Sequence, residues 1–370
     1  MQIGILKEPE HDPRVCMVPD TVHTLIEDGH TVLVEKGAGL QAFFDDQQYA
    51  DTGASLADRQ EILKASLVAC SITPLKDDEY SRVNKDAVFI SQFEPFARPD
   101  IPDLLASINL SAFSLDMIPR ITLAQSMDVL SSMASIAGYK AVLLAAGHLP
   151  RYFPMLTTAA GSIPPAKALI LGAGVAGLQA IATARRLGAV VEAFDTRSVV
   201  KEEVESLGGK FVMVEGARDE KGAGGYAVEQ SDEYKKKQQE LIKDRIAKSD
   251  VVITTAQLRG RPAPTLIPES TVKLMRPGSV IIDLASSTGG NCELSKDRET
   301  VKHYGVTIVG DSNLSALAPV HASMLYSKNL FNYLKVFIAE DKSFSFDPEN
   351  PVAGPSCLVY QGKRYYQHPT

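Results

Sequence analysis

The chain has 370 residues, of which 45% are hydrophobic and 22% charged, a composition typical of a folded protein long enough for two cores. Its formal net charge of −7 at pH 7 argues against a nucleic-acid partner. No run approaches the ~18 apolar residues of a bilayer-spanning helix, so we expect no membrane-spanning segment.

The N-terminal third of the chain alternates strand-like and helical segments. Strands are predicted at 2–6, 31–35, 67–72, 87–91 and 107–114. This alternation predicts an α/β domain with a mainly parallel sheet. Gly37-Ala38-Gly39 lacks the spacing of a nucleotide-binding turn. We therefore expect no dinucleotide site in this region.

A cluster of polar residues follows, just before a long helical pattern. Arg120, Gln125 and Asp128 fall within nine residues of one another. Asp128 can hold the guanidinium of Arg120, which would leave Gln125 with a donor and an acceptor for a ligand. The alternative is a capped helix start with a local ion pair.

The most informative motif is Gly-Ala-Gly-Val-Ala-Gly at 172–177, between a predicted strand at 168–171 and a helical pattern at 175–187. A further strand at 190–194 ends at Asp195, which stands 23 positions after Gly172. This order of elements is the dinucleotide-binding fingerprint in its required context. Gly172 permits the tight turn, Gly174 lets the backbone approach a pyrophosphate, and Gly177 lets the helix pack on the strand. The alternative is a glycine turn that only packs a helix on a sheet.

Asp195 indicates which cofactor to expect. Its carboxylate can accept both hydroxyls of the adenosine ribose and would repel a 2′-phosphate, which favours NAD(H) over NADP(H). Arg197 lies close enough to leave NADP(H) open. Four more strands, at 210–214, 250–255, 279–284 and 305–309, complete a doubly wound sheet of six strands.

Residues 215–245 form a polar stretch whose second half is expected to be a solvated helix. Its first half is a glycine-rich loop with Tyr226 at the tip. The loop can be an exposed connection, or a lid that closes over a planar ligand. The residues alone do not decide between the two.

Two long helical patterns, 126–146 and 323–339, mark the passages between the two sheets. We predict two doubly wound Rossmann-like α/β domains joined by these helices, with a cofactor cleft between them. The first domain would be discontinuous, 1–126 plus 323–370, and the NAD-binding domain would be 127–322. Two sequential domains with a helical tail remain the alternative.

The order of motifs resembles one known family, the NAD(H)-binding component of proton-translocating NAD(P) transhydrogenases. The motifs are Pro-Arg-Ile-x-x-x-Gln-Ser-Met-Asp-x-Leu-Ser-Ser from residue 119, Thr-Ala-Ala-Gly-Ser-Ile-Pro-Pro-Ala from 158, the fingerprint, Phe-Asp-Thr-Arg from 194, Gly-Gly-Tyr-Ala from 224, Arg-Pro-Ala-Pro from 261 and Gly-Gly-Asn-Cys from 289. The resemblance extends from residue 4 to a tail hairpin near 358–366.

The resemblance implies a role for each matched residue. Arg120, Gln125 and Asp128 would be the catalytic residues, at the nicotinamide and its ribose. The other implied cofactor contacts are Ile121, Thr122, Ser126, Met127 and Ser131 beside them, Gly172, Ala173, Gly174, Val175 and Gly177 at the pyrophosphate, Asp195, Thr196 and Arg197 at the adenosine ribose, Gly225 and Tyr226 in a mobile loop, and Gln257 near the adenine, where the family more often has leucine.

The resemblance also implies partners and a location. NADP(H) would be bound only by a partner subunit, a further subunit would span the membrane, and the chain would form a homodimer. The four cysteines lack metal-ligand spacing, so we expect no disulfide framework and no metal site. The chain begins without a secretion signal. We therefore expect a cytoplasmic protein, held peripherally on the inner face of the cell membrane by its partners.

Alanine dehydrogenases resemble the chain as well and provide the main alternative function. Reducing an imino acid needs a proton donor and cations for the substrate carboxylate. Similar alanine dehydrogenases have a lysine in a Lys-Glu-Pro segment and a histidine after the next strand. Here Lys76 follows Pro74, and no histidine occurs between His30 and His148. Direct hydride transfer between two nicotinamide rings needs no proton donor, which favours the transhydrogenase. A redox-sensing module that binds NAD(H) is a third alternative.

Overall fold

The computed structural model describes residues 1–213, 232–257 and 260–367. Contacts divide the chain into unit 1, Met1–Met133 with Ala318–Thr370, and unit 2, Ala134–Leu317. The division falls inside helix α5 (Val129–His148) and just before helix α10 (Pro319–Leu334). The domain boundaries predicted from the sequence, 126/127 and 322/323, fall just before α5 and inside α10, and they stay a prediction.

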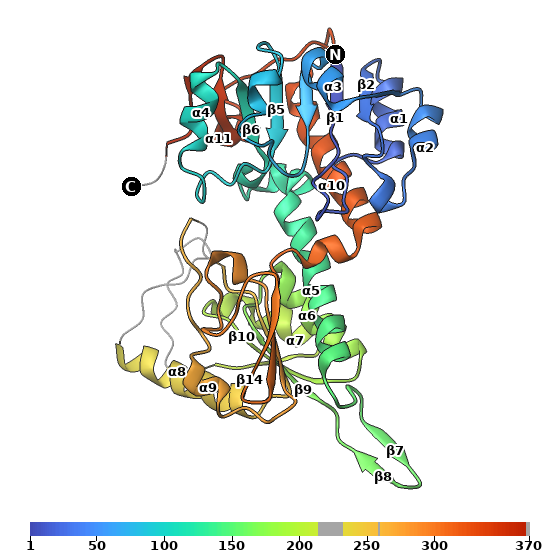
Figure 1. The fold of residues 1–370 in the computed structure, drawn as a ribbon. Helices are drawn as coiled ribbons and strands as arrows, with labels where there is room; N and C mark the ends of the chain where they lie inside the picture. The colour runs from blue at the N-terminus through green and yellow to red at the C-terminus, as the bar shows by residue number, and fades with distance from the viewer. Residues whose placement is uncertain (214–231, 258–259, 368–370) are drawn as a thin grey trace. The chain divides into compact units, whose positions relative to one another are not determined.

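Unit 1 contains an eight-stranded sheet of order β17-β16-β6-β5-β4-β1-β2-β3 (Figure 1). The first six strands in the chain are parallel and are arranged 3-2-1-4-5-6, while β16 and β17 add an antiparallel edge. The strands are β1 (Gln2–Ile5), β2 (Thr31–Glu35), β3 (Ser55–Ala57), β4 (Val68–Cys70), β5 (Val88–Ser91), β6 (Ser111–Ser114), β16 (Cys357–Tyr360) and β17 (Lys363–Arg364).

Short helices connect these strands. They are α1 (Pro19–Glu27), α2 (Asp46–Asp51), α3 (Arg59–Ala65), α4 (Ile101–Ser107) and α11 (Ala353–Ser356), with 3₁₀ helices η1 (Leu40–Ala42), η2 (Tyr80–Arg82), η3 (Leu115–Met117), η4 (Thr122–Met127) and η8 (Lys335–Phe337). The strand predicted at 107–114 is shorter than expected, because its first residue ends α4.

Unit 2 contains a seven-stranded sheet of order β11-β10-β9-β12-β13-β15-β14, in which only β14 runs antiparallel. The strands are β9 (Lys167–Leu171), β10 (Val190–Phe194), β11 (Lys210–Phe211), β12 (Val251–Thr254), β13 (Val280–Asp283), β14 (Glu299–His303) and β15 (Val306–Gly310). The helices are α6 (Val175–Arg186), α7 (Lys201–Ser206), α8 (Asp232–Ala247) and α9 (Glu269–Val272), with η5 (Ser198–Val200), η6 (Ser286–Thr288) and η7 (Leu314–Leu317).

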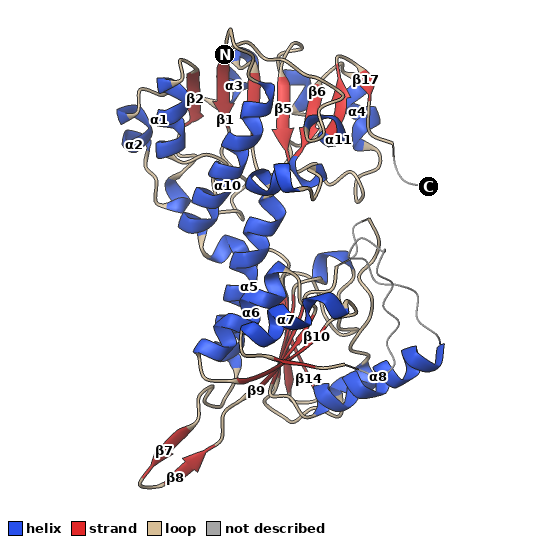
Figure 2. Cartoon of the chain, turned by 180° about the vertical axis from the view of Figure 1, so that it is seen from behind, coloured by secondary structure: helices blue, strands red, loops and turns tan. Residues whose placement is uncertain are grey.

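The sheet of unit 2 is buried on both faces because successive side chains of a strand point to opposite sides. In β9, Ala168 and Ile170 belong to a core with residues of α5, α6 and α7. Leu169 and Leu171 belong to a second core with residues of α8 and α9. Figure 2 shows α5, α6 and α7 on one side of this sheet and α8 on the other. This is the doubly wound α/β architecture that the sequence predicted.

Three strands in unit 2 were not predicted. β14 alternates exposed and half-buried positions at the edge of the sheet, so it lacks a hydrophobic run. β7 (Leu156–Thr158) and β8 (Gly161–Ile163) pair only with each other, and their hairpin extends away from the sheet (Figure 1). No side chain of the hairpin strands is buried, so its sequence carries no core pattern.

Helix α5 is unusually apolar. Among the described residues it alone is long and apolar enough to cross a membrane, with a mean hydropathy of 1.5 over an 18-residue window. Its Ala141, Val142 and Ala145 are fully buried in the core of unit 2. Because a core helix has the same length and composition, this hydropathy is weak evidence for a membrane span.

Candidate nucleotide-binding site

The glycine turn of unit 2 lies where the strand order reverses. β9 has β10 on one side and β12 on the other, so the connections after β9 and β12 diverge at the carboxyl edge of the sheet. In parallel α/β sheets this point is where a ligand crevice forms. The two connections touch, because the Thr255 hydroxyl donates to the carbonyl of Gly172 at 3.2 Å.

Each of the three fingerprint glycines faces different surroundings. Gly172 has φ +106°, and a Cβ there would lie 2.4 Å from Oγ1 of Thr255. A Cβ on Gly177 would lie 1.8 Å from the carbonyl oxygen of Gly172, so only glycine lets α6 pack this closely. A Cβ on Gly174 would meet nothing within 4 Å. Two glycines therefore serve the packing of the turn, and the third lies beside open space.

Helix α6 begins at this open position. Gly174 is its N-cap, and no side chain accepts a hydrogen bond from its first turn. Unpaired amides at a helix N-terminus attract anions through their partial positive charge. The turn can therefore hold a pyrophosphate. Ala173 in the turn is buried, and Val175 is partly exposed.

Asp195 lies at the end of β10, as predicted, but its carboxylate is already engaged. Oδ2 accepts the amide of Ala173 at 2.7 Å and Nη2 of Arg197 at 3.0 Å. Oδ1 accepts the amide of Arg197 at 2.8 Å and its Nε at 3.0 Å. The side chain of Asp195 is only 7% exposed, whereas that of Arg197 is 35% exposed. A ribose could reach this carboxylate only if the Arg197 side chain moved. Thr196 between them is exposed.

The ionised form of Asp195 is favoured in this arrangement. Burial raises the pKa of its carboxyl group, but the hydrogen bonds from Arg197 and from the Ala173 amide outweigh burial and hold the pKa below its ordinary value. The sequence predicted a carboxylate free for both ribose hydroxyls. The structure corrects this, because an ion pair with Arg197 occupies it.

On the other side of the reversal point, the segment after β12 is held by a residue that the sequence analysis did not single out. Asn291 is fully buried, and its side chain exchanges hydrogen bonds with the backbone of Ala256. The next residue, Gln257, is exposed and donates its Nε2 to the carbonyl of Leu284 at 2.9 Å. The Gly-Gly-Asn-Cys motif at 289–292 was the available signal.

The polar cluster before α5 belongs to unit 1 and differs from its prediction. Asp128 accepts the amide of Ser131 at 2.9 Å and its hydroxyl at 2.6 Å, so it caps α5. Both Asp128 and Arg120 are described by the structure, and no ion pair joins them. The prediction that Asp128 holds the Arg120 guanidinium is therefore wrong. The cap satisfies the carboxylate locally, without the arginine.

The predicted nicotinamide residues present their side chains to solvent. Arg120, Gln125 and Ser126 are exposed, as are Ile121 and Thr122, whereas Met127 is half-buried. The segment is anchored from α10, where Nδ2 of Asn329 donates to the carbonyl of Ser126 at 2.8 Å and Nδ2 of Asn332 does so at 3.2 Å. No sequence pattern pointed to these amides, which lie more than two hundred residues away.

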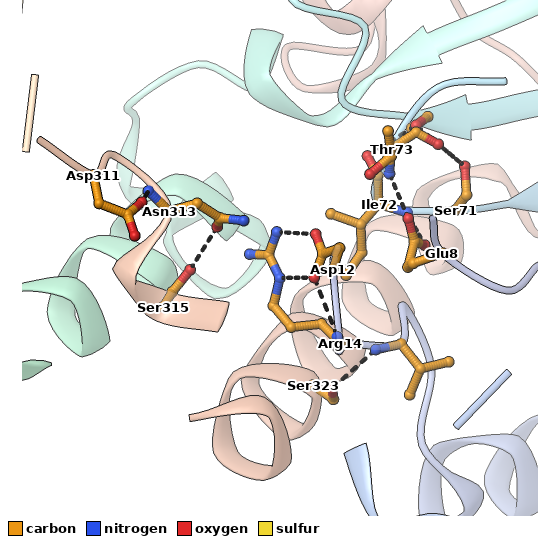
Figure 3. A network of polar contacts seen from close by, with 12 residues as sticks. Glu8, Asp12, Arg14, Ser71, Ile72, Thr73, Asp311, Asn313, Ser315 and Ser323 are labelled. Carbon is orange, nitrogen blue, oxygen red and sulfur yellow. Dashed lines mark hydrogen bonds and ion pairs between the residues drawn. The ribbon is translucent and has the colours of Figure 1, made fainter. Parts of the chain in front are cut away.

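Unit 1 has the same strand reversal, between β1 and β4, but an acidic side chain occupies it. Glu8 follows β1, and its carboxylate accepts the amides of Ile72 at 2.6 Å and Thr73 at 2.8 Å, both after β4 (Figure 3). Burial raises the pKa of Glu8 to about 7, although both amide hydrogen bonds lower it. This point offers a carboxylate where the fingerprint of unit 2 offers unpaired amides.

Next to Glu8, a buried arginine is paired within the same loop. Nε of Arg14 donates to Oδ1 of Asp12 at 2.8 Å, and Nη2 donates to Oδ2 at 2.5 Å (Figure 3). Both side chains are less than a tenth exposed. The bidentate pair directs the guanidinium at a carboxylate of its own chain.

Gly225 and Tyr226 lie outside the described residues, so the predicted lid stays a prediction. Of the polar stretch at 215–245, the described residues include α8 (Asp232–Ala247), in agreement with a helix in its second half.

Comparisons with known proteins match the chain along its length. Residues 4–137 match the family model "Alanine dehydrogenase/PNT, N-terminal domain", and residues 141–367 match "Alanine dehydrogenase/PNT, C-terminal domain". An NAD(P) transhydrogenase subunit alpha chain of Rhodospirillum rubrum is 42% identical, with 98% of this chain and 97% of the relative covered.

A solved structure and a second kind of relative extend this likeness. The crystal structure of transhydrogenase from Sinorhizobium meliloti has a TM-score of 0.90 at 40% identity, covering 98% of this chain and 100% of that one. Alanine dehydrogenase of Staphylococcus saprophyticus is 30% identical, with 90% of this chain and 89% of the relative covered. The chain is thus more similar to these transhydrogenases than to this alanine dehydrogenase.

Proposed function

The chain belongs to the alanine dehydrogenase/PNT family, and we propose that it is the NAD(H)-binding component of an NAD(P) transhydrogenase. It passes a hydride directly from NADH to NADP⁺ that a partner subunit carries, and the membrane-spanning subunit couples this transfer to proton translocation. The observation that carries the proposal is the asymmetry of the two strand reversals. The one in unit 2 has an open glycine turn, and the one in unit 1 is occupied by Glu8.

The residues of unit 2 would hold the adenosine and pyrophosphate end of the cofactor. The amides of the first turn of α6 face the phosphates, and Gly174 leaves room for their approach. Asp195 accepts the ribose hydroxyls after Arg197 has moved aside. The carboxylate repels a 2′-phosphate, which supports NAD(H) as the ligand of this chain and NADP(H) as the ligand of the partner.

The segment 120–131 would hold the nicotinamide end. Gln125 can bond the carboxamide and ribose with its donor and acceptor, and Arg120 supplies a cation beside them. When NADH is bound, its nicotinamide supplies the hydride. The protein then has to place the ring against a second ring and keep water away from the pair. No acid or base is needed for this step.

Reduction of an imino acid is the alternative, and the charged groups of unit 1 disfavour it. A substrate carboxylate needs an accessible cation, but Arg14 is bound bidentately to Asp12 in a buried pair. Lys76, the nearest lysine to the expected position, has an exposed side chain and follows Pro74. The sequence also lacks a histidine between His30 and His148 that could donate a proton.

We also propose that the protein is a homodimer, held peripherally on the cytoplasmic face of the membrane by its partner subunits. The β7–β8 hairpin supports the dimer. A two-stranded hairpin is marginally stable alone, and this one has Met155 and Ile163 beside or in its strands at 68% and 42% exposure. A second copy of the chain would cover these apolar side chains.

Isotope transfer tests the proposed step. NADH carrying deuterium at the transferred position of C4 is mixed with this protein, the NADP-binding partner and NADP⁺ in ordinary water. Direct transfer predicts NADPH that retains the deuterium. NADPH carrying hydrogen from water would contradict the proposal, because a carrier with exchangeable protons would then lie between the two nucleotides.

A further inference from the structure

We propose that Asn291 is a positioning residue that sets the affinity of unit 2 for NADH, by fixing the backbone of the segment 255–257 beside the glycine turn. The inference rests on the proposed function of unit 2 as the NADH site. It assigns a purpose to the Gly-Gly-Asn-Cys motif at 289–292, none of whose residues is among the expected cofactor contacts.

The side chain of Asn291 binds the backbone as a neighbouring strand would. Its Oδ1 accepts the amide of Ala256 at 3.1 Å, and its Nδ2 donates to the carbonyl of Ala256 at 2.8 Å. The same Nδ2 donates to the carbonyl of Pro264 at 2.8 Å. The residue is fully buried, so no water can replace these bonds without a rearrangement.

The backbone of Asn291 continues the same connection. Its carbonyl accepts the amides of Leu266 at 2.8 Å and Ile267 at 2.9 Å. Asn291 therefore bonds to residues both before and after the connection 257–263. Fixing both ends of a connection lowers the number of positions that its first residues can adopt.

The motif itself is held in place from the end of β13. Oδ2 of Asp283, which is fully buried, accepts the amide of Cys292 at 3.0 Å. A Cβ on Gly290 would lie 2.8 Å from the same oxygen, and Gly290 has φ +81°. The chain can therefore turn close to Asp283 only with glycine at this position, and the turn aims Asn291 at Ala256.

The position of the segment 255–257 matters because it touches the fingerprint. Oγ1 of Thr255 donates to the carbonyl of Gly172, and the place of the missing Gly172 Cβ lies 2.4 Å from Oγ1. At this separation even a small displacement of Thr255 would alter the turn that receives the pyrophosphate. The same segment ends in the exposed Gln257, on the expected adenine side.

The substitution Asn291→Asp tests this role at nearly constant shape. It replaces the Nδ2 donor with an acceptor that faces the carbonyls of Ala256 and Pro264, so both bonds become repulsive. We expect the Kd for NADH to rise about 10- to 100-fold, a loss comparable to that of other groups that orient a binding site. The rate of transfer with saturating NADH should stay within about threefold of wild type, because the nicotinamide segment is unchanged.

A matched control separates this role from a general loss of stability. Cys292→Ala changes the neighbouring residue, which is equally buried but contacts Asp283 through its backbone amide. We expect it to lower the Tm without raising the Kd. If Asn291→Asp does not fold, Asn291→Ser removes the same bonds without adding a charge and is measured instead.

The outcomes are distinct. A folded Asn291 variant with the wild-type Kd would overturn the positioning role, and so would a Kd and a Tm that change in parallel in both the Asn291 and the Cys292 variants. Failure of the wild-type protein to bind NADH would instead contradict the proposed function of unit 2.

Discussion

The carboxylate of Asp195 accepts the backbone amide of Ala173 at 2.7 Å, and this contact ties the end of β10 to the glycine turn. The same carboxylate carries Arg197 as a bidentate ion pair. Both the shape of the turn and the charge beside it therefore depend on one side chain.

Asp195→Asn should weaken NADH binding by roughly tenfold and erode the preference for NADH over NADPH. The amide would lose the charge that holds Arg197 and repels a 2′-phosphate, and the freed guanidinium could pair with that phosphate. Titration of the variant with each nucleotide measures both constants. An unchanged ratio of the two Kd values would show that the carboxylate does not contact the ribose.

Gly174→Ala and Gly177→Ala should have opposite effects. A methyl group at position 174 meets open space, so the Tm without ligand should stay close to wild type while the Kd for NADH rises. At position 177 it would clash with the carbonyl of Gly172, so we expect a stability loss of about 1–3 kcal/mol. Thermal unfolding with and without NADH distinguishes the two. Unaltered NADH binding by Gly174→Ala would place the pyrophosphate elsewhere.

Gln125→Asn should slow hydride transfer more than it weakens NADH binding. The shorter side chain moves the amide by about one methylene group, and transfer depends steeply on where the ring lies. Because Gln125 is exposed, the folded state should be unaffected. Single-turnover rates and Kd values are measured on the same preparation. A large loss of affinity with an unchanged transfer rate in the saturated complex would contradict the assignment of Gln125 to the nicotinamide.

Glu8 should make stability depend on pH. Burial raises its pKa from 4.5 to about 7 in the folded protein, so folding takes up a proton between these pH values. This contribution to the free energy of unfolding is complete below pH 4.5 and is lost as the pH rises through 7. The change is about 3 kcal/mol, at about 1.36 kcal/mol for each pKa unit.

Urea unfolding of the wild type and of Glu8→Gln at several pH values from 4.5 to 8 measures this effect. The wild type should lose more stability than the variant as the pH rises. The variant should also be less stable at the acid end, because its amide places a donor against one of the Ile72 and Thr73 amides. Parallel curves for the two proteins would exclude Glu8 as the source of the pH dependence.

The sequence was sufficient for the elements of the fold that depend on local pattern. The buried strand at 168–171, the glycine turn and the acid after the next strand lie where their spacing predicted. Steric demands at Gly172 and Gly177 are local to the turn and follow from the motif alone. Strand β14 was missed because an exposed edge strand needs no hydrophobic run.

The sequence was insufficient wherever a polar side chain had more than one partner within reach. Asp128 could cap α5 or bind Arg120, and the structure shows the cap. Asp195 could stay open for a ribose or pair with Arg197, and the structure shows the pair. Asn291 reaches Ala256 across 35 positions, a contact that depends on the packing of β12 beside β13 and that no spacing rule contains.

The most direct test of the central claim gives NADH to the purified protein in two mixtures. One contains the NADP-binding partner and NADP⁺, and the other contains pyruvate and ammonia. A protein that presents its nicotinamide to a second nucleotide consumes NADH only in the first mixture. Formation of alanine in the second, without transfer in the first, would contradict the proposal.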